Sequence, residues 1–303
     1  MKRFLNIGII QMPINKDVQT NLAYISKMVD LLMENYLKPE LVVGVECGIS
    51  MHEAEPIPGP STLFLCKIAA KYGIYFLPGT LLETNKELKK DQYYNSVPVI
   101  NPKGEIIDIY RKMAPWYPAE KSIPGNRYVV FEIPEKRTKV GVQICYDMNF
   151  PEISRNLTLM GSEVLVKLAA DPERLFEPYR HMTSIRALEN QVYFVATNGT
   201  GNSLYGHSSV SSPEGTKIWE AGREACCCTV TLDLDLVSLT RECGAFFLDQ
   251  NLNLLRHINP PMPFAGNFAD APVYRNLSSP AVNALEFQRK TGAFGIGTLI
   301  KNE

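Results

Sequence analysis

The stretch Lys139-Val-Gly-Val-Gln-Ile-Cys145-Tyr-Asp-Met-Asn-Phe-Pro-Glu152 joins an apolar run to a polar turn and then to a Pro-Glu pair. The apolar run is typical of a buried strand, and Pro-Glu is typical of the first turn of a helix. Cys145 is therefore expected at the carboxyl edge of a sheet, beside backbone N–H groups near a helix start. Such a setting favours the thiolate and offers donors to an oxyanion. Taken alone, a cysteine in an apolar strand is more often an inert core residue. Whether Cys145 is reactive therefore depends on the other segments of the chain.

Strand and helix signals alternate on both sides of this stretch, which predicts a mixed α/β fold. Ser61 is the expected cap of the second helix. Strands are expected at residues 4–11, 40–47, 74–83, 93–100, 105–111, 139–145, 163–168, 192–197, 207–211, 216–220 and 226–234, and helices at 17–37, 61–72, 151–160 and 172–190.

The composition changes near residue 259, where a Pro-rich segment begins and periodicity fades. We therefore predict one domain over residues 1–259 and a C-terminal extension over 260–303. Such a tail is either disordered or laid across a neighbouring subunit, and we expect the second arrangement, which implies a homo-oligomer.

The composition also excludes several classes of protein. The chain has 303 residues, 45% of them hydrophobic, and a net charge of −1, so a large core is expected and neither nucleic acid nor a membrane surface is an expected partner. Residues 1–10 resemble a first strand more than a signal peptide, which predicts a cytoplasmic protein. The seven cysteines and four histidines lack metal-ligand spacing, so no metal is expected. Period-2 alternation would place Cys226–Cys228 on both faces of a strand, in or near the core.

Two further segments carry chemistry that suits a nucleophilic cysteine. Glu46 ends the apolar run that begins at Leu41, and a carboxylate there needs a partner. Lys112 directly follows a predicted hairpin strand. A nucleophile, a proton-transfer group and a cation are what thiol-based amide hydrolysis requires. Considered singly, Lys112 would be a solvated charge at a strand end, and His207 a structural histidine.

Taken together, these segments resemble the nitrilase superfamily of carbon–nitrogen hydrolases. The order Glu46–Lys112–Cys145, the Tyr-Arg-Lys run and the Ile-Cys-Tyr-Asp-Met-Asn-Phe-Pro-Glu run carry the resemblance, which extends from about residue 4 to about residue 240. The Lys-Met-Ala-Pro-Trp-Tyr-Pro-Ala-Glu stretch and the Tyr-Gly-His-Ser run look most like the aliphatic amidase and formamidase branch. The Tyr-Asp-Met after Cys145 is similar to the ω-amidase branch.

The resemblance implies a four-layer αββα sandwich that associates through paired sandwiches, with no cofactor. It implies that Cys145 is the nucleophile, Glu46 the general base and Lys112 the oxyanion stabiliser. Glu120 would be a second catalytic glutamate that positions substrate or water. The expected substrate-binding residues are Trp116, Tyr117, Tyr146 (through its backbone N–H) and His207. The expected function is conversion of a small aliphatic amide to an acid and ammonia through a thioester.

Some positions depart from the amidase branch. Val45 stands where a proline usually precedes the glutamate, and Cys47 and Ser122 stand where relatives carry aromatic residues. Fewer aromatic side chains predict a wider pocket, so the sequence does not determine which amide is the substrate. Arg174 and Arg180 are surface helix charges in one interpretation and partners of a substrate carboxylate in another.

Other functions use the same residues. A nitrilase or an N-carbamoyl amide hydrolase would use the same triad. A catalytically silent binding or scaffold member would use none of it. A thiol redox protein would need a resolving cysteine, which the cysteine spacing does not supply.

Overall fold

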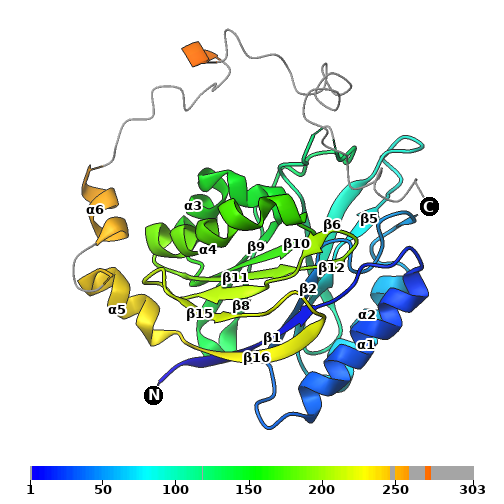
Figure 1. Cartoon of the computed structure of the whole chain (residues 1–303), viewed down its shortest axis with the longest axis horizontal. Helices are drawn as coiled ribbons and strands as arrows, with labels where there is room; N and C mark the ends of the chain where they lie inside the picture. The colour runs from blue at the N-terminus through cyan, green and yellow to red at the C-terminus, as the bar shows by residue number, and fades with distance from the viewer. Residues whose placement is uncertain (1, 118, 246–249, 259–269, 274–303) are drawn as a thin grey trace.

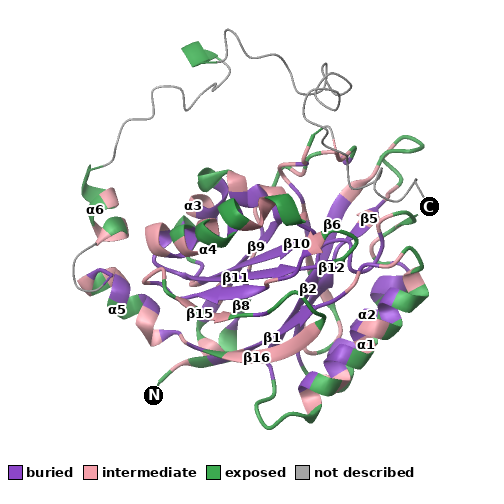
Figure 2. Cartoon of the chain, viewed as in Figure 1, coloured by how far each residue is buried: buried purple, intermediate pink, exposed green. Residues whose placement is uncertain are grey.

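The computed structural model describes residues 2–117, 119–245, 250–258 and 270–273. Two β-sheets lie face to face at its centre, and a pair of helices covers the outer face of each sheet (Figure 1). This is the αββα sandwich that the resemblance implies. Figure 2 shows the central strands as largely buried, because each sheet is covered on both faces.

The first sheet is built around three parallel strands at its centre. Strand β1 (Phe4–Gln11) pairs with β2 (Leu41–Val45), and β2 pairs with β4 (Tyr75–Gly79). The full order is β16 (Cys226–Asp233), β1, β2, β4, β6 (Tyr94–Ile100), β5 (Leu81–Glu83) and β3 (Ala54–Glu55), and β7 (Ile106–Arg111) pairs with β6.

The second sheet repeats this plan with its own parallel trio. Strands β9 (Thr138–Ile144), β10 (Val164–Ala169) and β11 (Tyr193–Asn198) are its centre. The full order is β15 (Lys217–Glu220), β14 (Ser209–Ser211), β11, β10, β9 and β8 (Val130–Ile133), and a separate small ribbon pairs β12 (Thr200–Gly201) with β13 (Leu204–Tyr205).

Alternating side chains divide the interior into three apolar layers. Leu5, Ile7 and Ile9 of β1 face the second sheet and pack there with Val140 and Val142 of β9. Helices α1 (Val18–Glu34) and α2 (Pro60–Tyr72) cover the other face of the first sheet, and α3 (Pro151–Leu159) and α4 (Phe176–Asn190) cover the second. The remaining helical elements are η1 (Pro134–Lys136), η2 (Cys145–Asn149), η3 (Glu173–Leu175), α5 (Asp235–Cys243) and α6 (Asn251–Ile258).

The structure corrects three local expectations. The cap of α2 is Gly59, because Pro60 already occupies the first helical turn and the Thr62 hydroxyl accepts a hydrogen bond from the Gly59 N–H at 2.8 Å, so Ser61 lies inside the helix. The strand expected over 40–47 ends at Val45. The strand expected over 74–83 divides into β4 and β5, because Gly79 adopts a φ of 135°.

The expected strand at the three adjacent cysteines is confirmed. Cys226, Cys227 and Cys228 pair with Gln11, Ile10 and Ile9 of β1, and all three cysteines are half-buried. Cys227 packs against the apolar layer under α1 and α2. The proposed boundary at residue 259 stays a prediction, since nearly all of the 260–303 extension lies outside the described residues.

Gly44 offers a test of how closely the strands of the first sheet approach each other. A Cβ at Gly44 would lie 2.1 Å from the carbonyl oxygen of Pro78, so Gly44→Ala forces β2 away from β4. We expect the free energy of unfolding in urea to fall by about 1–3 kcal/mol. The matched control is Gly222→Ala, whose new methyl group would meet no atom within 4 Å and should change stability by less than about 0.5 kcal/mol. Equal effects of the two substitutions would contradict the close approach.

Candidate active site

The candidate residues lie just beyond the carboxyl ends of strands. Glu46 follows β2, Lys112 follows β7, and Cys145 follows β9. Adjacent ends of parallel strands meet at one edge of a sheet, and the two sheets face each other, so these side chains converge between the sheets. All three are buried, with exposed fractions of 0%, 0% and 3%.

Cys145 occupies a strained turn between β9 and α3. Its φ is +48°, a left-handed conformation that non-glycine residues rarely adopt and that costs about 1–3 kcal/mol. Asp147 holds this turn in place, because its carboxylate accepts hydrogen bonds from Ile144 N at 2.9 Å and from the Tyr110 hydroxyl at 2.7 Å. It also accepts one from Ala114 N at 2.8 Å, which ties the cysteine turn to the segment that carries Lys112.

Glu46 has the partners that a buried carboxylate requires. The ammonium of Lys112 lies 2.8 Å from Glu46 Oε1, and Asn95 Nδ2 donates to the same oxygen at 2.9 Å. Its second oxygen, Oε2, accepts from the backbone N–H of Ala170 at 3.0 Å. Lys112 also forms an ion pair with Glu120, whose side chain is 12% exposed. The structure therefore brings Glu46, Lys112 and Glu120 into direct contact.

Burial dominates the acid–base properties of this group. It raises the pKa of Glu120, an effect that Lys112 opposes and that Glu46 reinforces. Burial disfavours the Lys112 ammonium, but Cys145, Glu120 and Glu46 together outweigh it and hold the pKa of Lys112 well above its usual value. Lys112 is therefore a permanent cation in this site.

The expectation of a favoured thiolate at Cys145 is wrong for the resting protein. Burial, and then the negative charge of Glu46, raise the pKa of the Cys145 thiol well above its usual value, although Lys112 opposes them. Desolvation outweighs the nearby helix start, because the sulfur has almost no contact with water. Cys145 is thus a neutral thiol in the resting protein.

A second buried ion pair, which the sequence reasoning missed, contacts the sulfur. Asp171 follows β10, and its Oδ1 lies 3.2 Å from Cys145 Sγ. Lys167 of β10 forms an ion pair with Asp171, and both side chains are 1% exposed. A lysine within an apolar strand and an aspartate just after it were the available signals, because they follow the same pattern that identified Glu46.

The expected substrate-binding residues divide between two places. Trp116 and Tyr146 stack with ring centroids 6.1 Å apart, so they form one aromatic wall beside Cys145. Tyr117 is 38% exposed, and its hydroxyl donates to the carbonyl of Ser122 at 3.0 Å. The His207 ring instead packs on Phe176, with centroids 4.4 Å apart, and its Nδ1 lies 3.3 Å from Glu220.

His207 lines a narrow cavity of about 10 Å³, which it shares with Asp171 and Tyr205. This volume holds about one water, and a substrate role for His207 stays a prediction. Arg180 also lines this cavity, with its guanidinium 5.3 Å from the ring of Phe176. Arg174 instead lies beside the aromatic wall, with its guanidinium 5.5 Å from the Trp116 ring.

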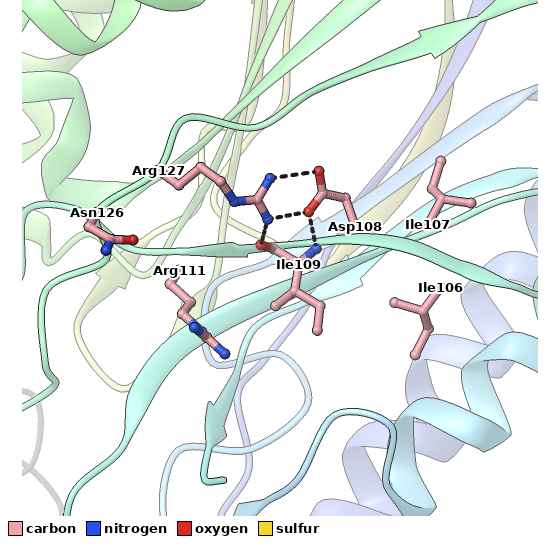
Figure 3. A pocket seen from close by; sticks show the side chains of 7 residues that line it. All are labelled: Ile106, Ile107, Asp108, Ile109, Arg111, Asn126 and Arg127. Atoms are coloured by element: carbon pink, nitrogen blue, oxygen red, sulfur yellow. Dashed lines mark hydrogen bonds and ion pairs between the residues drawn. The ribbon is translucent and has the colours of Figure 1, made fainter. Parts of the chain in front are cut away.

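A larger cavity of about 260 Å³ lies along β7 and is not lined by Glu46, Lys112, Cys145 or Asp171 (Figure 3). Its main feature is a surface ion pair between Arg127 and Asp108, and Arg127 also donates to the carbonyl of Ile109 at 3.2 Å. Within the described residues, no group of three or more His, Cys, Asp or Glu side chains could hold a metal ion. In the same part of the chain, no helix combines the length and the hydropathy that a membrane span requires.

An αββα sandwich with a buried cysteine, carboxylates and an ammonium between its sheets defines a class of thiol-containing hydrolases. Residues 6–242 match the family described as carbon–nitrogen hydrolase, and the chain belongs to this family within the nitrilase superfamily.

Named relatives and a solved structure agree with this assignment. A Schizosaccharomyces pombe protein named "Probable nitrilase" is 31% identical over 84% of this chain and 99% of its own length. The Xenopus laevis omega-amidase NIT2-B is 31% identical over 62% of this chain and 72% of its own. The structure of Saccharomyces cerevisiae Nit3 superposes with a TM-score of 0.73 at 26% identity, over 79% of this chain and 94% of Nit3.

Asp147 predicts a measurable dependence of stability on pH. Burial raises its pKa from 3.8 to about 6, against the hydrogen bonds from Tyr110 and Ile144. Between about pH 4 and 6 the unfolded chain releases this proton while the folded protein keeps it, so the free energy of unfolding falls as pH rises. The shift corresponds to roughly 2–3 kcal/mol across this window. Asp147→Asn should remove this contribution to the slope of unfolding free energy against pH, as measured by urea titrations at pH 4, 5, 6 and 7.

The comparison uses slopes and not absolute stabilities, because the asparagine also disturbs three hydrogen bonds. Asp91→Asn, at an exposed turn, is the control and should leave the slope unchanged. An Asp147→Asn protein that retains the wild-type slope would show that this carboxyl group does not hold its proton in the folded state.

Proposed function

We propose that this carbon–nitrogen hydrolase is an amidase that converts an aliphatic amide to a carboxylic acid and ammonia. The observation that carries the proposal is the buried Glu46–Lys112–Glu120 cluster around a cysteine held at a positive φ. A carboxylate, a permanent cation and a thiol are the three parts that acyl transfer to sulfur requires.

In this proposal Glu46 removes the Cys145 proton as the sulfur attacks the amide carbonyl. The raised pKa of the thiol makes this base necessary, because very little thiolate exists at neutral pH. The negative charge that develops on the carbonyl oxygen is met by Lys112 and by the backbone N–H of Tyr146. Each such donor contributes about 3–4 kcal/mol to the rate. Glu46 then gives this proton to the amide nitrogen, which leaves as ammonia.

Water then hydrolyses the thioester, with Glu46 again as the base and Glu120 positioning the water or the substrate. The raised pKa of Glu120 suits a carboxyl group that shares a proton with its surroundings. Because Lys112 contacts both glutamates, one cation holds the two acids and the oxyanion site in a fixed relation.

The walls of the pocket favour acyl groups longer than formyl or acetyl. Cys47 interacts electrostatically with Glu46, Glu120 and Lys112, so a small side chain stands next to the catalytic group. Trp116 and Tyr146 form the wide aromatic wall. We further propose that the protein is a cytoplasmic homo-oligomer built from paired sandwiches and that residues 260–303 contact a neighbouring subunit.

A second candidate substrate class is the monoamide of a dicarboxylic acid. The observation that favours it is the exposed guanidinium of Arg174 over Trp116, where a substrate carboxylate could meet it at the edge of the aromatic wall. The relative named omega-amidase NIT2-B lends support to this class.

The amidase proposal predicts that ammonia release depends on one of the seven cysteines. Cys145→Ala should abolish release from short amides, dicarboxylic monoamides, carbamoyl amino acids and nitriles, and Cys145→Ser should retain well under 1% of the rate, because the alcohol is a much poorer nucleophile. The control is Cys66→Ala, which changes a buried cysteine of α2.

Product analysis in the same screen separates the related activities. Carbon dioxide released with ammonia identifies a carbamoyl hydrolase, and consumption of a nitrile identifies a nitrilase. Undiminished ammonia release by the Cys145→Ala protein would contradict the proposal. Absence of turnover of every compound by the wild-type protein would favour a non-catalytic binding protein.

Arg174 predicts a difference between charged and neutral substrates. Arg174→Ala should raise KM for a dicarboxylic monoamide about 10- to 100-fold, the loss expected for a charge-assisted hydrogen bond, and leave KM for a neutral amide of equal length unchanged. Arg256→Ala in α6 removes an exposed guanidinium elsewhere and serves as the control. An equal rise for both substrates would assign Arg174 to the shape of the wall and not to carboxylate binding.

A further inference from the structure

The Lys167–Asp171 ion pair is the one buried charged pair next to the reacting sulfur, among the described residues, that the proposed mechanism does not use. Its position is fixed from several sides. The Tyr205 hydroxyl donates to Asp171 Oδ2 at 3.0 Å, and Lys167 binds the same oxygen. The backbone N–H of Asp171 donates to Asn198 Oδ1 at 2.8 Å.

This arrangement leaves the other carboxylate oxygen to the thiol. Cys145 Sγ donates to Asp171 Oδ1 at 3.2 Å, and both groups are almost fully buried. The contact follows from the topology, because Ile144 of β9 pairs with Leu168 of β10, so the residues after the two strands are neighbours. Within the described part of the chain, Asp171 is the hydrogen-bond acceptor of this sulfur.

We propose that Asp171 is a positioning residue that holds the resting Cys145 as a protonated thiol, and that Lys167 and Tyr205 fix its carboxylate in place for this purpose. The inference rests on the proposed role of Cys145 as nucleophile. For attack, the S–H···Oδ1 hydrogen bond breaks and the proton passes from sulfur to Glu46. The sulfur electron pair forms the bond to the carbonyl carbon, and the π pair of the C=O bond moves to the oxygen, where Lys112 and the Tyr146 N–H meet it. Asp171 keeps its own protonation state throughout.

The charges around the sulfur support this division of roles. Glu46 and Asp171 oppose loss of the thiol proton, and Lys112 and Lys167 favour it. Both oxygens of Asp171 are already engaged, Oδ2 by two donors and Oδ1 by the thiol itself. The charged or titratable groups that face Cys145 come from both sheets, from α4 and from β13 of the small ribbon. They are Glu46, Lys112, Lys167, Asp171, Tyr179 and Tyr205.

Alkylation by iodoacetamide tests the proposal without relying on turnover. The tryptic peptide of residues 140–155 contains Cys145 as its single cysteine, so mass spectrometry can follow this thiol apart from the other six. Asp171→Asn should be alkylated about 10-fold faster than wild type at pH 7, with the midpoint of the rate–pH curve about one unit lower. Asp108→Asn, which disturbs the surface ion pair of Figure 3, is the control and should match wild type.

Lys167→Met should have the opposite effect, with slower alkylation and a higher midpoint, because it leaves the carboxylate beside the sulfur without its cation. Lys167→Met/Asp171→Asn leaves no unpaired buried charge and carries the test if the Asp171→Asn protein does not fold. Its midpoint should fall by less than that of Asp171→Asn, since the closer charge, Asp171, has the larger effect on the sulfur.

A purely structural role would alter the amount of folded protein but would not move the two midpoints in opposite directions. Asp171→Asn with the wild-type rate and midpoint overturns the proposal. Slower alkylation of Asp171→Asn overturns it too, because it would make Asp171 the base. Wild-type protein that releases ammonia from none of the compounds tested would overturn the amidase proposal alone, since the alkylation result concerns only the state of the thiol.

Discussion

The contact of Lys112 with Glu46 is the interaction on which the site depends. Both side chains are completely buried, and they directly follow strands β7 and β2 of the first sheet. Glu46 also accepts a hydrogen bond from Ala170, just after β10 of the second sheet, so one carboxylate links the two sheets. Removal of Lys112 would leave Glu46 and Glu120 without their cation, at a cost of about 3–5 kcal/mol. The geometry of the site and the stacking of the sheets therefore share one constraint.

Burial gives this site its order and also limits its reactivity. The burial that encloses Lys112 with its two glutamates also raises the pKa of the Cys145 thiol. A neutral thiol is a weak nucleophile, so in the proposed mechanism proton transfer to a carboxylate accompanies attack. The positive φ of Cys145 has a related function, because it turns the residue out of the β9 ladder at the edge where Lys112 and Glu46 lie.

Much of this arrangement was predictable from the sequence. The alternation of elements predicts strands whose carboxyl ends carry or adjoin Glu46, Lys112 and Cys145, and the edge of a sheet is a place where polar groups at such ends meet. Desolvation was not predictable, because it depends on how completely two sheets cover the sulfur, and a helix start alone suggested the opposite pKa shift. The sequence does not single out Lys167 and Asp171, because a lysine inside an apolar run fits the strand pattern and its partner, four residues on, lies beyond the strand end. The packing of the His207 ring on Phe176 also depends on tertiary structure that the sequence pattern does not reveal.

Two carboxylates lie near one sulfur, and their surroundings differentiate them. Glu46 shares Lys112 with Glu120, so its charge is part of a network that also includes the oxyanion site. Asp171 is held by Lys167 and Tyr205, and its other carboxylate oxygen contacts the thiol. In the proposed mechanism, a proton that moves to Glu46 enters the network in which charge changes during the reaction, whereas the Asp171 network remains constant. On this proposal, the pairing of each acid with a different buried lysine gives one sulfur a resting partner and a reacting partner.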